Sequence, residues 1–99
     1  MKNLIHITVK DIVSNTETNV EGVKLYCIIE KTIKDNSTII LEIENDMILS
    51  SSFLNSSLGS ILDNYGFNNL KNNLKLKCNK YQFQRINTYL NKYKELYQN

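Results

Sequence analysis

Three consecutive hydroxyl side chains, Ser50, Ser51 and Ser52, are the residues of this chain best suited to recognition or chemistry. They stand between an apolar run and a helical pattern that begins at Phe53. A hydroxyl in this place can cap the helix, hydrogen-bond an incoming acidic group, or accept a phosphoryl group that the helix terminus then stabilises. Capping is the simplest of the three roles, and we assign it to Ser52.

Other side chains with catalytic or metal-binding chemistry have no matching partners in the sequence. His6 alternates with apolar neighbours, which is typical of a structural strand histidine rather than a catalytic base. Glu42, Glu44 and Asp46 alternate, but no histidine or cysteine clusters with them as metal ligands would. The three glycines are scattered, so there is no phosphate-binding loop. We therefore expect no enzyme, no metal and no cofactor.

The two cysteines and the hydropathy pattern predict a cytoplasmic protein. Cys27 and Cys78 are far apart and cannot form a disulfide framework or a cysteine-rich zinc site, which favours a reducing compartment. No apolar run approaches the roughly 20 residues that span a bilayer, and the start of the chain does not resemble a signal peptide. No contact with a membrane is expected.

Hydrophobic periodicity predicts strands and helices in alternation. Apolar residues recur every second position in the strands and every third or fourth in the helices. Thr18 and Glu21 form a capping-box pattern before the first helix, and Gly66 stands where a left-handed cap would end the second. The expected strands cover 4–9, 38–43 and 74–78, and the expected helices cover 19–34, 53–65 and 80–97.

The element order predicts a single α/β domain over residues 1–99, with a mostly parallel sheet and helices packed on it. The 38–43 run is apolar at nearly every position, which predicts a central strand covered by helices on both faces. The alternation in 74–78 predicts a strand near a sheet edge with one solvated face. The last helix is expected to pack on the sheet, with Phe83 and Leu96 on its apolar side.

Charge is distributed unevenly although the net charge is only +2. Residues 1–69 contain five lysines and nine acids, whereas residues 70–99 contain six lysines and Arg85 against a single Glu95. Such asymmetry can mark a surface for nucleic acid or for an acidic protein. The abundance of asparagine, isoleucine and lysine is equally typical of an AT-rich genome. The candidate basic surface comprises Lys71, Lys75, Lys77 and Arg85.

The residues from Ile39 to Gly59 carry a resemblance to a known family. They form an apolar strand, an acidic bend and then the pattern S-S-S-F-L-x-x-x-L-G. This segment resembles the STAS-like domains of unknown function that are marked by a Ser-Ser-Phe turn. Those domains are distant relatives of the STAS anti-sigma-factor antagonists. The resemblance implies a small STAS-like β-α-β-α-β-α layer fold.

The resemblance also implies a non-enzymatic regulatory module that switches between protein partners in signal transduction. Such a bacterial or phage protein would bind a kinase-like ATPase, or another regulator, through the turn and helix of Ser50–Leu58, as a monomer or a homodimer. Carried over by position, Ser51 occupies the phospho-acceptor place, while Ser50 stands where the antagonists have aspartate and Phe53 where they have glycine. The expected partner-binding residues are Ser50, Ser51, Ser52, Phe53 and Asn55.

An alternative function follows from the basic C-terminal third of the chain. In this interpretation the chain is a small phage or mobile-element protein that binds nucleic acid or inhibits a host protein. Tyrosines interleaved with cations are typical of surfaces that stack single-stranded nucleic acid. The expected helical arc places Tyr89 and Tyr93 toward the core instead, so we favour a protein partner.

Overall fold

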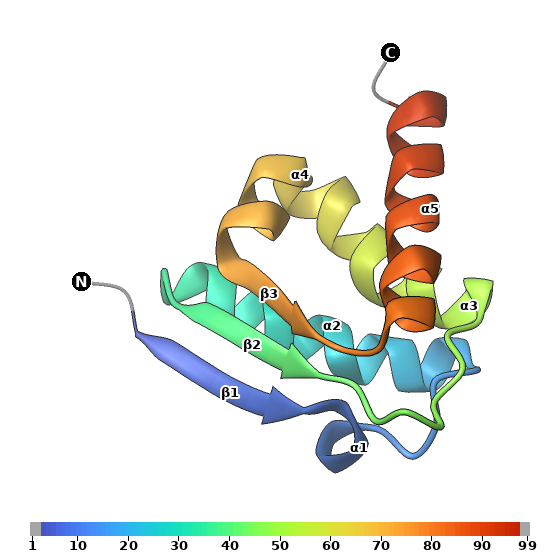
Figure 1. Cartoon of the computed structure of the whole chain (residues 1–99). Helices are drawn as coiled ribbons and strands as arrows, with labels where there is room; N and C mark the ends of the chain where they lie inside the picture. Colours follow the sequence, from blue (N-terminus) through green and yellow to red (C-terminus); the bar gives the residue numbers. More distant parts are fainter. Residues whose placement is uncertain (1–2, 98–99) are drawn as a thin grey trace.

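A computed structural model describes residues 3–97, with side chains from Asn3 to Leu96, as an α/β fold with a three-stranded parallel sheet (Figure 1). The strand order is β1-β2-β3, so β2 is central. This confirms the α/β class and the parallel sheet. The elements in chain order are β1 (Leu4–Thr8), α1 (Val9–Ile12), α2 (Asn19–Lys34), β2 (Thr38–Glu42), α3 (Ser51–Leu54), the π-helical turn η1 (Asn55–Gly59), α4 (Ser60–Asn73), β3 (Leu74–Lys77) and α5 (Lys80–Tyr97).

The first long helix, α2, begins and ends at the residues that its pattern predicts. The Thr18 hydroxyl accepts a hydrogen bond from the Glu21 N–H at 3.3 Å, which is one half of the capping box. The other half is not formed, because the Glu21 carboxylate accepts from the backbone N–H of Ser14 and pairs with Lys24 at 2.7 Å. Glu21 therefore fastens the loop before α2 to the helix.

Only one face of the sheet is covered by helices, and the prediction that helices cover both faces of β2 was wrong. Ile7, Leu41 and Leu76 are aligned across the three strands on the covered face. The strands are added in one direction, in the order β1-β2-β3, so two crossovers of the usual right hand place both connections on the same face of the sheet. The opposite face is open over the described residues, and Ile40 and Glu42 of β2 are only partly buried there.

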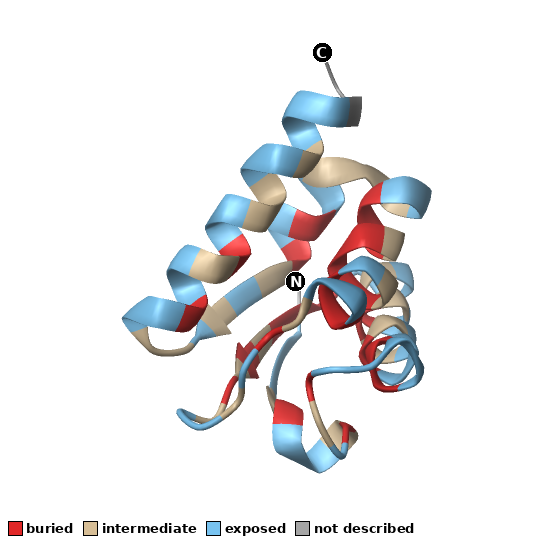
Figure 2. Ribbon diagram, turned by 90° about the vertical axis from the view of Figure 1, so that its right-hand side faces the viewer, coloured by how far each residue is buried: buried red, intermediate tan, exposed pale blue. Residues whose placement is uncertain are grey.

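The core lies between the covered face and the helices α2, α3 and α4. Its most deeply buried large side chains are Phe53, Ile29, Ile39, Leu41 and Leu54. Figure 2 shows the buried residues gathered where the helices meet the sheet and one another. No helix in the described part of the chain has both the length and the apolar content to cross a membrane.

Gly66 has the positive φ that the sequence predicts, and it interrupts the helix at that residue. Its backbone angles are φ 84° and ψ 166°, and the helix resumes beyond this kink and runs to Asn73. A Cβ at this position would meet no atom within 4 Å, so the backbone angle rather than space requires glycine. The helix that begins at the corner is therefore broken at Gly66, where its end was predicted, and the second helical segment up to Asn73 was not predicted.

The last helix, α5, covers the predicted residues but contacts different neighbours. Ile86 reaches the core with 3% exposure, whereas Phe83 and Leu96, expected on the apolar side, are 53% and 69% exposed. Gln82 is buried and donates from Nε2 to the carbonyl oxygens of Glu44 and Met47. These contacts hold the start of α5 beside the loop that follows β2, next to α3 (Figure 1).

Candidate functional site

The corner between β2 and α3 is fixed by Ser50, the N-cap residue of α3. Its Oγ accepts a hydrogen bond from the Phe53 N–H at 3.0 Å and donates to the Glu17 carbonyl at 2.8 Å. The Ser50 N–H donates to the carbonyl of Thr16 at 3.0 Å. The cap therefore falls on Ser50 and not on Ser52, because α3 begins two residues earlier than its apolar pattern indicates.

The predicted partner-binding residues fall into two groups, one exposed and one buried. Ser51, Ser52 and Asn55 are exposed, and they lie on the outer side of α3 and η1. Ser50 is half-buried, and its hydroxyl is occupied by capping. Phe53 is 1% exposed, because its ring fills the core beneath the corner. The expectation that Phe53 contacts a partner is therefore corrected: it positions the corner from the inside.

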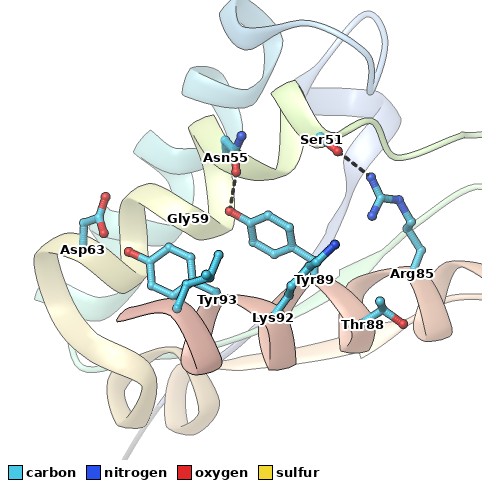
Figure 3. Close-up of a pocket in the computed structure, with 10 residues that line it drawn as sticks. Ser51, Asn55, Gly59, Asp63, Arg85, Thr88, Tyr89, Lys92 and Tyr93 are labelled. Atoms are coloured by element: carbon cyan, nitrogen blue, oxygen red, sulfur yellow. Dashed lines mark hydrogen bonds between the residues drawn. The ribbon is translucent and has the colours of Figure 1, made fainter. Parts of the chain in front are cut away.

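Two hydrogen bonds connect the exposed residues of the corner to α5 (Figure 3). Arg85 Nη2 donates to Ser51 Oγ at 3.0 Å, and the Tyr89 hydroxyl donates to Asn55 Oδ1 at 2.7 Å. Both bonds join residues that are 34 apart in the sequence. Each helix therefore contributes an i, i+4 pair, and α5 runs in the same direction as α3 and η1.

Arg85 is half-buried at this corner and has no carboxylate partner among the described residues. Its Nε donates to the carbonyl of Leu49 at 3.0 Å, and its Nη2 donates to Ser51. Both acceptors are neutral. Guanidinium groups form their strongest hydrogen bonds with carboxylates and phosphates, so the geometry leaves Arg85 suited to an anionic group brought by another molecule.

A groove of about 520 Å³ runs between the corner and α5. Lys92 and Tyr93 line the α5 side, and Asp63 of α4 lines the opposite side (Figure 3). Leu96 of α5 also lines the groove. Gly59 forms part of the floor, and a Cβ there would meet the Tyr89 hydroxyl at 2.5 Å. The missing side chain at residue 59 thus allows Tyr89 to reach Asn55.

The turn η1 makes a wide, π-type helical turn directly under the exposed residues. Hydroxyls of the serine-rich sequence bond to carbonyl groups of the widened region: Ser57 donates to Phe53 at 2.7 Å, and Ser60 donates to Asn55 at 3.3 Å. Wide turns of this kind occur frequently at functional sites. The serines that follow Asn55 therefore have a local structural role.

The candidate basic residues do not form one surface. Lys75 and Lys77 lie on the open face of β3, where Lys77 Nζ is 3.8 Å from Glu42. Lys71 is exposed near the end of α4. Arg85 instead points to Ser51 in the groove. The structure thus connects Arg85 to the serine corner rather than to the lysines.

The remaining candidate residues take part in surface or core contacts. His6 Nε2 lies 2.9 Å from Glu42 on the open face of the sheet. Glu44 and Asp46 line a separate cavity beside the loop at 13–17. No group of metal-ligating side chains occurs within residues 3–97. Cys27 is exposed, and burial raises the pKa of the half-buried Cys78 thiol.

The sequence interpretation missed a polar cluster that joins α2 to α4. The hydroxyls of Tyr26 and Tyr65 both donate to Glu30 Oε2 at 2.7 Å, and Asn64 donates to the Tyr26 hydroxyl. These two hydroxyls hold the pKa of the Glu30 carboxyl below its usual value, and the carboxylate raises the pKa of Tyr65 to about 12. The cluster lies on α2 and α4 and is not part of the groove.

Comparison with known proteins identifies one family. The family model for the STAS-like domain of unknown function (DUF4325) matches residues 21–80, from the first turn of α2 to the first residue of α5. The chain belongs to this family. No curated protein and no solved structure matches it significantly. The match contains the whole serine corner of this STAS-like chain, whereas β1 and the rest of α5 lie outside the matched residues.

Proposed function

We propose that this STAS-like chain is a non-enzymatic regulatory module that binds a partner protein through its corner surface. The corner surface consists of the exposed side chains of Ser51, Ser52 and Asn55, together with Arg85 beside them. The observation that carries the proposal is that these side chains are displayed on a helix whose other side is locked into the core by Phe53. Rigid backbone with exposed polar groups is suited to recognition, because little order is lost on binding.

The chemistry of the corner surface favours a partner that presents an acidic group. Arg85 carries a half-buried positive charge that no described carboxylate neutralises, and arginine is enriched among residues that dominate binding energy. The resemblance to STAS antagonists suggests a kinase-like ATPase as the partner, with partner switching in cytoplasmic signal transduction as the role. The source would be bacterial or phage.

Ser51 is the candidate phospho-acceptor in this scheme. Its hydroxyl is exposed and already lies 3.0 Å from Arg85 Nη2. A phosphoryl group on Ser51 adds negative charge and three acceptor oxygens, which Arg85 is placed to bind. Phosphorylation would therefore use the same cation that an acidic partner would use, and it would weaken binding of that partner.

Affinity capture followed by mass spectrometry tests the proposal. The tagged wild-type chain is compared with Ser52→Arg, which places a large cation on the corner surface at a position whose side chain has no structural hydrogen bond. Lys75→Glu, on the open face of the sheet, is the matched control. We expect one protein to be enriched by the wild type and the control and lost with Ser52→Arg, while all three chains keep the same circular dichroism spectrum.

The alternative, nucleic-acid binding through Lys71, Lys75 and Lys77, predicts the opposite pattern. Lys75→Glu would then abolish a mobility shift of single-stranded nucleic acid at low salt, and Ser52→Arg would not weaken it. Enrichment of the same protein by Ser52→Arg and by the wild type would refute the proposed corner surface.

A further inference from the structure

The two edges of the sheet are protected to different degrees against pairing with a further strand. The β3 edge carries Lys75 and Lys77, and both side chains are exposed. Lysines on an edge strand hinder pairing with another strand, because their charges would have to be buried or brought together. The β1 edge is the sequence Leu-Ile-His-Ile-Thr, with no lysine, acid or proline. Leu4 is 64% exposed and Ile5 is 37% exposed on it.

The β1 edge is also regular and uncovered. All five residues of β1 are in unbroken register with β2, so there is no bulge that would disturb a further strand. β1 is the terminal strand of the sheet, and Figure 1 shows no helix or strand along its outer side in the described chain. A regular edge without lysine, acid or proline is a template for strand pairing.

The backbone groups that face this edge can be identified from the register. The Thr38 N–H donates to the Asn3 carbonyl at 2.8 Å, and Leu4 is aligned with Thr38. In a parallel ladder alternate residues point toward the neighbouring strand, so Ile5 and Ile7 bond to β2. The N–H groups of Leu4, His6 and Thr8 therefore point outward, as do the carbonyls of Leu4 and His6.

We propose that β1 pairs in antiparallel orientation with β1 of a second copy of this chain, around a two-fold axis at His6. Pairing would join the two three-stranded sheets into one sheet of six strands. The axis places His6 opposite His6, and these residues exchange both N–H···O bonds. It also places Leu4 opposite Thr8, where the Thr8 N–H donates to the Leu4 carbonyl of the other copy.

The side chains of this edge favour a second copy over a different strand. The same axis places Ile5 opposite Ile7 of the other copy, so the partly exposed Ile5 would be covered by a β-branched residue, a favourable cross-strand pair. The edge offers no charge for an unrelated strand to recognise except His6, which is already within 2.9 Å of Glu42. β1 lies outside the family match, so this inference is independent of the corner surface.

Solution mass and amide exchange test the pairing directly. Light scattering over a concentration series should show a dimer that dissociates on dilution. Residue-resolved hydrogen exchange by NMR should show the His6 and Thr8 amides slowing as the dimer forms, whereas the Ile5 and Ile7 amides are protected at every concentration. A chain that stays monomeric throughout, or a dimer whose His6 and Thr8 amides exchange freely, would disprove the proposal.

Charge variants test the register. A Leu4→Lys/Thr8→Lys chain and a Leu4→Glu/Thr8→Glu chain should each be monomeric, because like charges would lie opposite each other across the axis. Mixed in equal amounts, they should form a one-to-one heterodimer. Lys75→Glu changes the other edge and should dimerise like the wild type. Circular dichroism establishes that each chain is folded, and folded charge variants that dimerise separately, or fail to pair when mixed, contradict the proposed register.

Discussion

The two sides of the helical segment that follows β2 illustrate different constraints on the same stretch of sequence. On the inner side, Phe53 and Ser57 are almost completely buried and hydrogen-bonded or packed into the core. On the outer side, Ser51, Ser52 and Asn55 are exposed, and the side chains of Ser51 and Asn55 form hydrogen bonds with α5. The inner side is determined by packing, so the outer side is free to vary with function.

Removal of the Phe53 side chain, which holds the inner side in the core, should cause the largest loss of stability. Phe53→Ala leaves a cavity in the core, and we expect it to lower the free energy of unfolding by about 3–5 kcal/mol. Phe83→Ala, at a position that is 53% exposed, is the matched control and should have a much smaller effect. Urea denaturation measures both, and equal effects would mean that the corner is not anchored by its phenylalanine.

A side chain added to α2 where it packs against the inner side of α3 should cause the next largest loss of stability. A Cβ on Gly22 would lie 2.7 Å from the Phe53 carbonyl oxygen and would also overlap the Ser56 hydroxyl. Glycine-to-alanine changes inside helices are usually stabilising, but here the overlap involves backbone, and we expect Gly22→Ala to destabilise by about 1–3 kcal/mol. A thermal melt that shows stabilisation would contradict the close approach of α2 and α3.

Substitution of Ser50 should cost more stability than substitution of Ser51, because only Ser50 caps α3. Ser50→Ala removes the hydrogen bond to the Phe53 N–H and should lower the free energy of unfolding by about 1 kcal/mol. Ser51→Ala removes a surface contact with Arg85 and should change stability by no more than about 0.5 kcal/mol. Denaturation curves of the two variants give the comparison, and it fails if Ser51→Ala is the more damaging.

The smallest expected effect is the pH dependence from Glu30, which is partly solvated and therefore screened. Its pKa is lowered in the folded chain by the hydroxyls of Tyr26 and Tyr65. Its contribution to stability is therefore complete above the unfolded pKa of about 4.3 and is lost as the pH falls through the lower folded pKa.

Denaturation of the wild type and Glu30→Gln between pH 7 and pH 3 measures this contribution. The difference in unfolding free energy between the two chains should shrink below about pH 4.3. Tyr65→Phe removes one of the two hydroxyl donors and should weaken the pH dependence. A difference that stays constant over the whole range would show that Glu30 does not contribute in this way.

Local patterns predicted the elements well because their causes are local. The bounds of α2 and α5, and the start of β2, follow from the period of the apolar residues. The positive φ of Gly66 was also predicted, since glycine tolerates it. The coverage of the sheet by helices was not predicted correctly. It depends on the direction in which successive strands are added, and no single segment encodes that direction.

The candidate site was predicted only in part, for a related reason. The serine run indicated an exposed corner, but motif spacing alone did not show that Phe53 points inward. The contact of Arg85 with Ser51 joins residues that are 34 apart in the sequence and lie on two different helices. One sequence signal for this contact was available: Ser51 and Asn55 are four residues apart, as are Arg85 and Tyr89. The matching spacing indicates a contact only once α3 and α5 are known to be neighbours.

The wide turn Asn55–Gly59 has a consequence for insertions and deletions in relatives of this chain. Each helical residue advances the chain by about 100° around the axis. A π-type turn holds one residue more than the α-helical turn it replaces, so deletion of one residue here would close it to a regular α-helix and keep both Phe53 and Ile61 on the core side. Insertion of one residue would instead rotate Phe53 out of its core position. Relatives should therefore tolerate a one-residue deletion in this turn better than a one-residue insertion between residues 53 and 61.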